Sequence, residues 1–162
     1  MKTKTILRVN IGAGSRPKQG YENIDVRPLP GIRRVDLRRR FPYASASIRE
    51  FLAEDVLEHF RPTELEKHVL PEIFRCLAPG GVLVLQMPDL HEMVRQWQAG
   101  GRVTDEIMSL RIHGRQDYPE NTHYASYTKD SMTRLLRKIG FANVRHAATR
   151  QWNMVLHATK AR

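Results

Sequence analysis

The spacing of apolar residues along the 162-residue chain predicts an alternation of short strands and longer helices. Short apolar runs bounded by glycine, proline or charged residues are typical of strands. The run Val82-Leu-Val-Leu-Gln-Met87 is almost continuously apolar, as expected for a strand buried on both faces. We therefore expect strands at residues 6–11, 21–26, 32–37, 49–53, 82–87, 144–148 and 154–160.

Apolar residues at helical spacing indicate the helices. After Pro62, a residue favoured at a first helical position, come Leu65, Val69, Ile73 and Leu77. Proline at position 71 should kink this helix, and Pro79-Gly-Gly81 should end it. Capping residues and stop glycines predict further helices at residues 89–98, where Asp89 and Glu92 form a capping box, at 104–113 and at 128–139.

Strands that alternate with helices favour an α/β fold with a mostly parallel sheet covered on both faces. The last two strands are close enough to form an antiparallel hairpin. Between the first two strands there is no room for a full crossover helix. The chain contains no internal repeat, low-complexity tract or linker, so we expect a single domain over residues 1–162.

Composition is ordinary for a globular protein, with 41% apolar and 27% charged residues. The single cysteine, Cys76, excludes a disulfide scaffold and a cysteine-rich zinc site. No apolar run is long enough for a membrane span, and the charged N-terminus does not resemble a secretory signal. We therefore expect a cytoplasmic protein.

Charge changes this picture, because the chain carries 27 basic and 17 acidic residues, a formal net charge of +10. Arginines at positions 33, 34, 38, 39 and 40 form a cluster that could bind phosphate groups. No aromatic residues interleave with this cluster, as they would on a base-stacking surface. A solvated arginine-rich surface is therefore favoured, and a nucleic-acid site is the alternative hypothesis.

The strongest chemical signal is the segment Val9-Asn-Ile-Gly-Ala-Gly14, a strand that runs directly into Gly-x-Gly. Asp25 ends the next strand and Asp36-Leu37 the one after, so all three features lie at the carboxyl ends of strands. A dinucleotide is disfavoured, because Pro17 replaces the third glycine and Asp25 follows Gly14 by only 11 residues. A nucleoside without phosphate fits better.

Six stretches in order carry a resemblance to class I S-adenosylmethionine-dependent methyltransferases, especially small bacterial proteins of the type-11-like group. They are Val9-Asn-Ile-Gly-Ala-Gly14, Tyr21-Glu-Asn-Ile-Asp25, Val35-Asp-Leu37, Asp55-Val-Leu-Glu-His-Phe60, Glu72-Ile-Phe-Arg-Cys-Leu-Ala-Pro-Gly-Gly81 and Leu135-Leu-Arg-Lys-Ile-Gly-Phe141. The resemblance implies a doubly wound, Rossmann-like, seven-stranded sheet. It further implies residues 1–88 as the cofactor-binding half, 89–130 as the substrate wall and 131–162 as the C-terminal helix and hairpin.

The cofactor implied by the resemblance is S-adenosylmethionine, with S-adenosylhomocysteine as product. Carried over to this sequence, the family pattern gives the methionine part to Asn10, Gly12, Ala13 and Gly14, the ribose to Asp25, the adenine to Asp36 and Leu37, and the sulfonium region to Ala53 and Glu54. Two departures are visible. Asparagine stands at position 10 where the family has an acidic residue, and the nearly absent first crossover helix leaves one side of the cofactor open.

Methyl transfer to oxygen or nitrogen often needs a base, and His59 is the candidate because the motif places it near the methyl group. A structural role for His59 is equally compatible with the motif. Asp89, His91, His123 and Tyr124 are candidate substrate contacts in the wall segment. The histidines show no regular metal-ligand spacing, so no metal site is expected.

Three functions follow from these observations. The leading hypothesis is in-line methyl transfer from S-adenosylmethionine to a hydroxyl or amine of a small-molecule or glycan-like acceptor. The second is an RNA methyltransferase that uses the arginine-rich surface. The third is a non-catalytic, methyltransferase-like binding module. Assembly as a homodimer is open.

Overall fold

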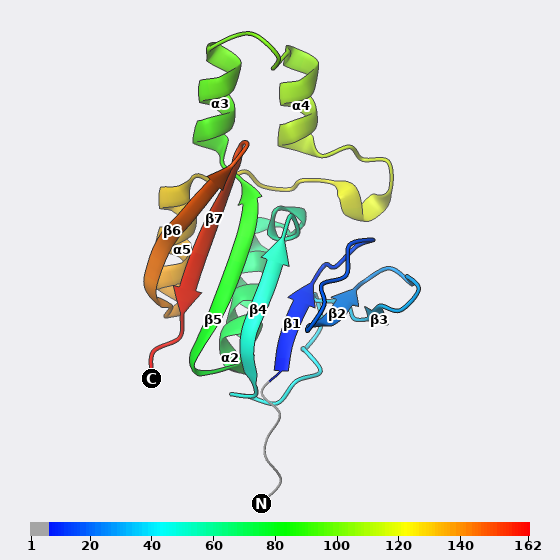
Figure 1. Ribbon diagram of the computed structural model, residues 1–162, viewed down its shortest axis with the longest axis vertical. Helices are drawn as coiled ribbons and strands as arrows, with labels where there is room; N and C mark the ends of the chain where they lie inside the picture. The colour runs from blue at the N-terminus through cyan, green and yellow to red at the C-terminus, as the bar shows by residue number, and fades with distance from the viewer. Residues whose placement is uncertain (1–6) are drawn as a thin grey trace, which may run out of the picture.

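The computed structural model describes residues 7–162 (Figure 1). Ile6, the expected start of the first strand, lies outside the described residues. Seven strands form one sheet in the order β3-β2-β1-β4-β5-β7-β6. They are β1 (Leu7–Ile11), β2 (Glu22–Asp25), β3 (Arg33–Arg34), β4 (Ile48–Glu54), β5 (Leu77–Pro88), β6 (Ala142–Arg150) and β7 (Asn153–Thr159).

The pairing of these strands confirms the predicted mostly parallel sheet. Strands β3, β2, β1, β4 and β5 pair in parallel, whereas β7 is antiparallel to both β5 and β6. The strand order reverses at β1, so the carboxyl ends of β1 and β4 flank the point of reversal. Ligands of open α/β sheets bind at such a point.

The helix after β4 is made of three pieces: α1 (Pro62–Glu64), a π-helical turn η2 (Leu65–Val69) and α2 (Leu70–Cys76). Because Pro71 has no amide hydrogen, it cannot continue the α-helical ladder, and the Leu70 N–H bonds back to the Leu65 carbonyl. The expected kink is therefore a π turn. Leu77, expected as a helical position, instead begins β5. The last carbonyls of α2 accept hydrogen bonds from the backbone amides of Ala46 and Ser47 and from the Lys160 ammonium group, which also bonds the Leu77 carbonyl.

Three later helices agree with the prediction: α3 (Leu90–Gln98), α4 (Asp105–His113) and α5 (Lys129–Ile139). Thr104 and Thr128 cap α4 and α5, which end at Gly114 and Gly140. Asp89 caps α3, but Glu92 pairs with Arg95, so the expected capping box at this helix is wrong. Within the described residues, no helix is both long and apolar enough to cross a membrane.

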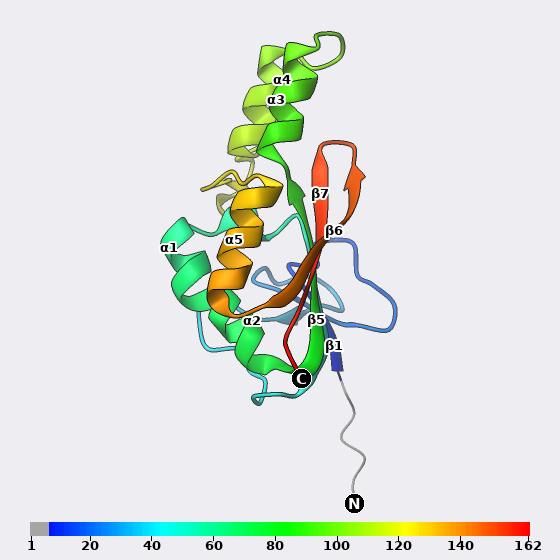
Figure 2. The same cartoon turned by 90° about the vertical axis from the view of Figure 1, so that its left-hand side faces the viewer.

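The two faces of the sheet differ. Helices α1, α2 and α5 all lie against one face, while α3 and α4 project beyond the carboxyl ends of the strands (Figures 1 and 2). On β5, Leu83, Leu85 and Met87 are fully buried in the core, whereas the alternate residues are only half-buried. The expectation that helices cover both faces is wrong for residues 7–162, because the connections between β1, β2 and β3 contain no helix.

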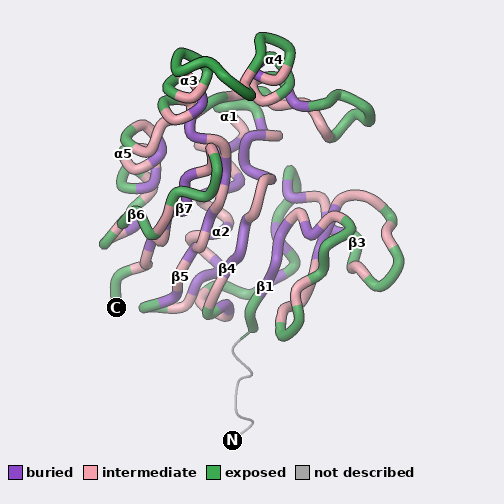
Figure 3. The backbone as a smooth tube through the Cα atoms, turned by 45° about the horizontal axis from the view of Figure 1, so that its top comes forward, coloured by how far each residue is buried: buried purple, intermediate pink, exposed green. Residues whose placement is uncertain are grey.

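Buried residues are concentrated in the central strands β1, β4 and β5 and in helix α2, which packs against them (Figure 3). The core joins Ile11 and Phe51 of the sheet to Leu70 and Ile73 of α2 and to Leu136 of α5. This packed layer fixes the strand ends from which the cavity described below is built.

Candidate active site

A cavity of about 360 Å³ lies at the carboxyl ends of β1, β2 and β4. Cavities of about 300–1,000 Å³ are typical of small-molecule sites. Residues that line it are Asn10, Gly12, Ala13, Gly14, Ser15, Arg16, Lys18, Asp25, Val26, Arg27, Val35, Asp36, Leu37, Arg38, Glu54, Asp55, Val56, His59, Phe60, Tyr118 and Glu120. The structure therefore brings together nearly all the residues predicted to bind a cofactor.

The glycine turn after β1 forms one wall of the cavity. Gly12 has a φ of +62°, and a Cβ atom there would lie 2.3 Å from Cγ2 of Val56. Gly12 is therefore required both by its left-handed backbone and by the close approach of Val56. The neighbouring Ala13 N–H donates to the Ile24 carbonyl at 3.0 Å, which fixes the turn against the end of β2.

Asp25 is held in place by its own chain, and its residue is only 6% exposed. Oδ2 accepts a hydrogen bond from the Gly14 N–H at 2.8 Å, and Oδ1 accepts from the Arg27 N–H at 2.9 Å. The Arg27 Nε also donates to Oδ1 at 3.2 Å. A carboxylate offers about four acceptor positions, so Asp25 keeps acceptor capacity toward the cavity.

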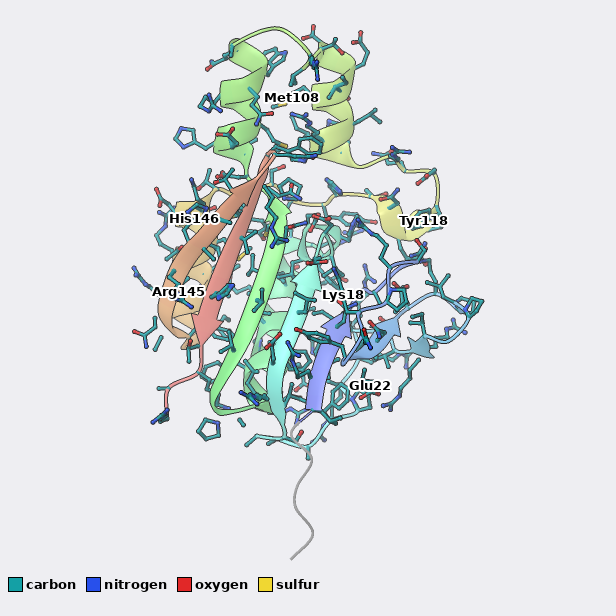
Figure 4. The ribbon with its side chains drawn as sticks, viewed as in Figure 1. Lys18, Glu22, Met108, Tyr118, Arg145 and His146 are labelled. Carbon is teal, nitrogen blue, oxygen red and sulfur yellow. The ribbon has the colours of Figure 1, made fainter. Side chains whose placement is uncertain are left out.

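Arg27 also links this strand end to the segment that follows α4. Its guanidinium lies 4.6 Å from the centre of the Tyr118 ring, next to the short helix η3 (Pro119–Asn121). Figure 4 labels Tyr118 on this segment. Tyr118 and Glu120 line the cavity, a contribution that the sequence did not reveal because η3 lies far along the chain from the strands that form the cavity.

Asn10, at the position where the family pattern has an acidic residue, is 3% exposed. Its side-chain amide donates to Oδ1 of Asn23 at 2.9 Å, and the same oxygen accepts from the Lys18 N–H at 2.7 Å. The two asparagines therefore tie β1, β2 and the intervening turn together.

Opposite charges meet across the cavity at the end of β4. Lys18 forms an ion pair with Glu54 at 2.7 Å, and Arg16 lies 3.8 Å from Asp55. Asp55 has a φ of +52°, a strained conformation for a residue other than glycine. Its carboxylate accepts from Asn153 at 2.8 Å and from Gln86 at 3.3 Å, while burial raises its pKa.

Asp36 and Leu37 lie at the other end of the cavity. Strand β3 ends at Arg34, earlier than expected, so both residues belong to the turn after it. Oδ1 of Asp36 accepts from the Arg38 N–H at 2.9 Å, and Leu37 is 6% exposed. The turn thus presents one carboxylate and one apolar side chain to the cavity.

Other predicted residues lie outside the cavity lining. Ala53 is fully buried beneath it, and Asp89 is fully buried as the cap of α3. Asp89 and His91 line a second hollow beside α3. Tyr124 is exposed and lies 5.3 Å from the Arg61 guanidinium. Trp97 is 42% exposed, and its indole N–H donates to Asp105, which joins α3 to α4.

His59, the predicted base, lines the cavity at the short helix η1 (Leu57–His59). One ligand atom from each of Glu58, His59 and His123 lies within 4.8 Å of the others. Burial raises the pKa of Glu58 to about 8 and lowers the pKa of both histidines. The sequence did not predict this cluster, because His123 belongs to a distant segment and only the adjacent Glu58-His59 pair was visible.

Backbone hydrogen bonds bring these two segments together. The Tyr124 N–H donates to the Glu58 carbonyl at 2.9 Å, and His59 Nδ1 lies 3.1 Å from the Thr122 carbonyl. His123 Nδ1 lies 3.0 Å from the Arg111 carbonyl. Since a carbonyl can only accept, both Nδ1 atoms carry the proton, and in the neutral rings both Nε2 atoms are acceptors.

Residues 52–146 match the sequence pattern of the methyltransferase-domain family Methyltransf_23, so the chain belongs to this family. A search of curated proteins finds no match. Solved structures of similar fold include an S-adenosylmethionine-dependent methyltransferase from Methanosarcina mazei, with 16% identity, a TM-score of 0.63, and coverage of 98% of this chain and 93% of that chain.

Two further structures share the fold. Burkholderia thailandensis 1,6-didemethyltoxoflavin-N1-methyltransferase, solved with bound 1,6-didemethyltoxoflavin and S-adenosylhomocysteine, is 16% identical with a TM-score of 0.64, covering 96% of this chain and 71% of that chain. Human N-acetylserotonin methyltransferase, solved with S-adenosylmethionine, is 16% identical with a TM-score of 0.61, covering 96% of this chain and 48% of that chain.

Family and fold together define a class I methyltransferase, an enzyme whose methyl donor is S-adenosylmethionine. The residues present fit this donor. The Gly12 turn leaves open the space that a Cβ would fill, Asp25 offers a fixed carboxylate, and Leu37 offers an apolar surface in the same cavity.

Proposed function

We propose that this enzyme transfers the methyl group of S-adenosylmethionine to a hydroxyl or amine of a small-molecule or glycan-like acceptor by in-line displacement. The observation that carries the proposal is the single cavity that unites the Gly12 turn, the Asp25 carboxylate and the end of β4. A methyl donor bound there would place its reactive group beside the segment after α4, which lines the cavity with Tyr118 and Glu120.

The donor would run across the strand ends from β3 to β4. Leu37 and Asp36 would contact the adenine, Asp25 the ribose hydroxyls, and the turn from Gly12 to Gly14 the methionine part. The ribose hydroxyls would compete with the Arg27 Nε for Oδ1 of Asp25, so donor binding should move the Arg27 side chain.

The amino-acid end of the donor is a zwitterion, and the cavity offers both signs of charge to it. Lys18 suits the carboxylate and Glu54 suits the ammonium group, where the family pattern uses an acidic residue at position 10. Both side chains line the cavity, and their mutual ion pair shows that they reach the same point. Asn10 is engaged with Asn23 and would support the turn rather than bind the ammonium group.

This orientation puts the sulfonium near β1 and β4 and leaves the acceptor on the far side of β4. His59 and Phe60 line the cavity there, and Tyr118 and Glu120 border it from the segment after α4. Alignment of the two reactants supplies much of the rate enhancement for such a displacement. We accordingly assign residues 1–88 mainly to donor binding and part of 89–130 to the acceptor.

The arginine cluster gives little support to an RNA acceptor. Arg33 pairs with Glu22 at 2.6 Å, Arg38 with Glu64 at 3.4 Å, and Arg39 with Asp36 at 3.7 Å. Arg34 donates to the Val26 carbonyl. Four of the five guanidinium groups in the cluster therefore already have partners within the chain, which favours a small acceptor.

The proposal is tested by incubating the protein with methyl-deuterated S-adenosylmethionine and separate pools of sugars, phenols, small amines and total RNA. Mass spectrometry should find the labelled methyl group on a small acceptor, together with an equal amount of S-adenosylhomocysteine. Labelled methyl groups on RNA alone, with RNA binding that weakens steeply as salt rises, would show that the acceptor is RNA rather than a small molecule. Absence of S-adenosylmethionine binding would instead favour a non-catalytic module.

A further inference from the structure

We infer that Glu58, His59 and His123 form a binding site for a divalent transition-metal ion at the acceptor end of the cavity. The site itself is argued from the geometry of these three residues, whereas its role in the reaction rests on the proposed methyl transfer. Two imidazoles and one carboxylate form a ligand set used by catalytic zinc and non-haem iron sites.

The spacing of the three groups suits one ion. Their ligand atoms lie within 4.8 Å of one another. Nitrogen and oxygen ligands bind such ions at about 2.0–2.2 Å, so the ligand atoms of a tetrahedral site lie about 3.3–3.6 Å apart. Side-chain rotations that bring the ligand atoms about 1 Å closer together would therefore enclose an ion.

The hydrogen bonds of both histidines are those expected of metal ligands. Each Nδ1–H donates to a backbone carbonyl, of Thr122 for His59 and of Arg111 for His123. Such bonds fix the tautomer and the ring orientation, and they leave Nε2 as the ligand nitrogen. The two rings pack edge to face with centroids 4.9 Å apart, so the two histidines are in direct contact.

Glu58 supplies a second, independent observation. Its residue is 2% exposed, and its Oε2 atom is buried without a hydrogen-bond partner among the described residues. An unsatisfied buried carboxylate oxygen is costly, and a bound cation would satisfy it. A cation would give this oxygen atom the partner that it lacks among the described residues.

Backbone hydrogen bonds and a close backbone contact hold together the segments around the cluster. The Tyr124 N–H to Glu58 carbonyl bond joins the two ligand-bearing segments, and the His123 N–H donates to the His113 carbonyl. Gly114 has a φ of +75°, and a Cβ there would lie 2.3 Å from the Asn121 carbonyl oxygen. Three ligands held in this way leave further coordination positions for a substrate oxygen.

His59 also lines the cavity, so the ion would lie where the acceptor meets the methyl group. A hydroxyl bound to the ion would lose its proton to water more readily. The oxygen would then form a bond to the methyl carbon as the carbon–sulfur bond breaks and its electron pair goes to sulfur. A metal-bound Nε2 cannot accept a proton, so this assignment replaces the base role expected of His59.

The test uses untagged protein treated with EDTA, dialysed, and titrated with Co²⁺ alone while visible absorption is recorded. We expect saturable d–d bands at one Co²⁺ per chain, with Zn²⁺ competing for the site. His59→Ala, His123→Ala and Glu58→Gln should each weaken Co²⁺ binding at least tenfold. The matched control is His146→Ala on the exposed strand β6, labelled in Figure 4, which should bind Co²⁺ like the wild type.

Calorimetry with S-adenosylhomocysteine on the same EDTA-treated samples separates this inference from the proposed function. If the three variants bind S-adenosylhomocysteine normally and lose Co²⁺, the metal site stands and the fold is intact. If the wild type shows no Co²⁺ bands, or the variants keep them, the cluster is only a packed histidine pair and the inference is wrong. Failure to bind S-adenosylmethionine, with Co²⁺ binding retained, would contradict the proposed function alone.

Discussion

The two ends of the cavity are built in different ways. At the donor end, Gly12 lies in the turn that directly follows β1, and Asp25 is the last residue of the neighbouring strand β2. At the acceptor end, Glu58 and His59 meet His123 only because backbone bonds join η1 to the segment after α4. Each end nevertheless depends on a glycine with positive φ, Gly12 or Gly114, against which another segment packs.

The proposed donor site is therefore formed by residues close together in the sequence, whereas the proposed acceptor site depends on contacts between distant segments. Mutations should therefore separate the two, except where an element belongs to both ends. Val56 is such an element, because it packs on Gly12 and directly precedes η1.

Gly12→Ala should have the largest effect and damage both ends. The new Cβ would overlap Val56 at 2.3 Å in a backbone conformation unfavourable to alanine. We expect a loss of about 2–4 kcal/mol in the free energy of unfolding, measured in urea, together with loss of donor and Co²⁺ binding. Gly20→Ala is the control, because Gly20 has a φ of +79° but no atom within 4 Å of its Cβ position. Equal stability losses in the two variants would show that Val56 does not limit the site.

Asp25→Ala should affect the donor end alone. It removes a carboxylate that we expect to bind the ribose hydroxyls, a loss of about 1.5–3 kcal/mol, or about 10–100-fold in affinity. Calorimetry with S-adenosylhomocysteine measures this change, while Co²⁺ titration should give the wild-type result. Asp130→Ala on the exposed start of α5 is the matched control. Unchanged donor affinity in Asp25→Ala would remove Asp25 from the proposed site.

Gly114→Ala should affect the acceptor end alone. Its Cβ would collide with the Asn121 carbonyl and lie 3.0 Å from the His123 ring, so the histidine must move. We expect about tenfold weaker Co²⁺ binding, as for other disturbances of a metal ligand's support, with unchanged donor affinity. Gly101→Ala, where φ is +91° and the space is open, serves as the comparison. Parallel loss of donor and metal binding would mean that the two ends are coupled.

The smallest effect concerns acid stability where α2 packs against the segment between β3 and β4. Glu72 accepts from the Phe41 N–H at 2.8 Å, and its pairing with Arg75 lowers its pKa to about 2. Because the folded-state pKa is below the ordinary value, this stabilisation is present above about pH 4.5 and is lost as pH falls toward 2.

Glu72→Gln should lower the free energy of unfolding by about 1 kcal/mol at neutral pH. The difference from the wild type should shrink between pH 4.5 and 2, and urea unfolding across that range measures it. A difference that stays constant with pH would show that the charge of Glu72 does not hold the segment between β3 and β4.

The sequence predicted the parts of the fold that local chemistry decides. Thr104, Thr128, Gly114 and Gly140 bounded α4 and α5 correctly, because caps and stop glycines act on adjacent backbone. The Gly12 turn and Asp25 were found for the same reason: strand, turn and carboxylate follow one another along the chain.

Features that depend on distant partners could not be predicted. Helix α2 ends at Cys76, where Ala46, Ser47 and Lys160 donate hydrogen bonds to its last carbonyls. The spacing of apolar residues alone predicted that the helix would include Leu77. One face of the sheet is uncovered because the connections between β1, β2 and β3 contain no helix. The apolar run of β5 therefore predicted burial on both faces, whereas only alternate residues are buried. The cluster at His123 and the position of Tyr118 depend on the path of the segment after α4.

The most direct test of the central claim is a crystal structure of the protein grown with S-adenosylhomocysteine. We expect its density in the cavity at the strand ends, with adenine against Leu37, ribose hydroxyls on Asp25 and sulfur toward His59. An empty cavity at saturating ligand, or a nucleoside bound elsewhere on the chain, would contradict the account.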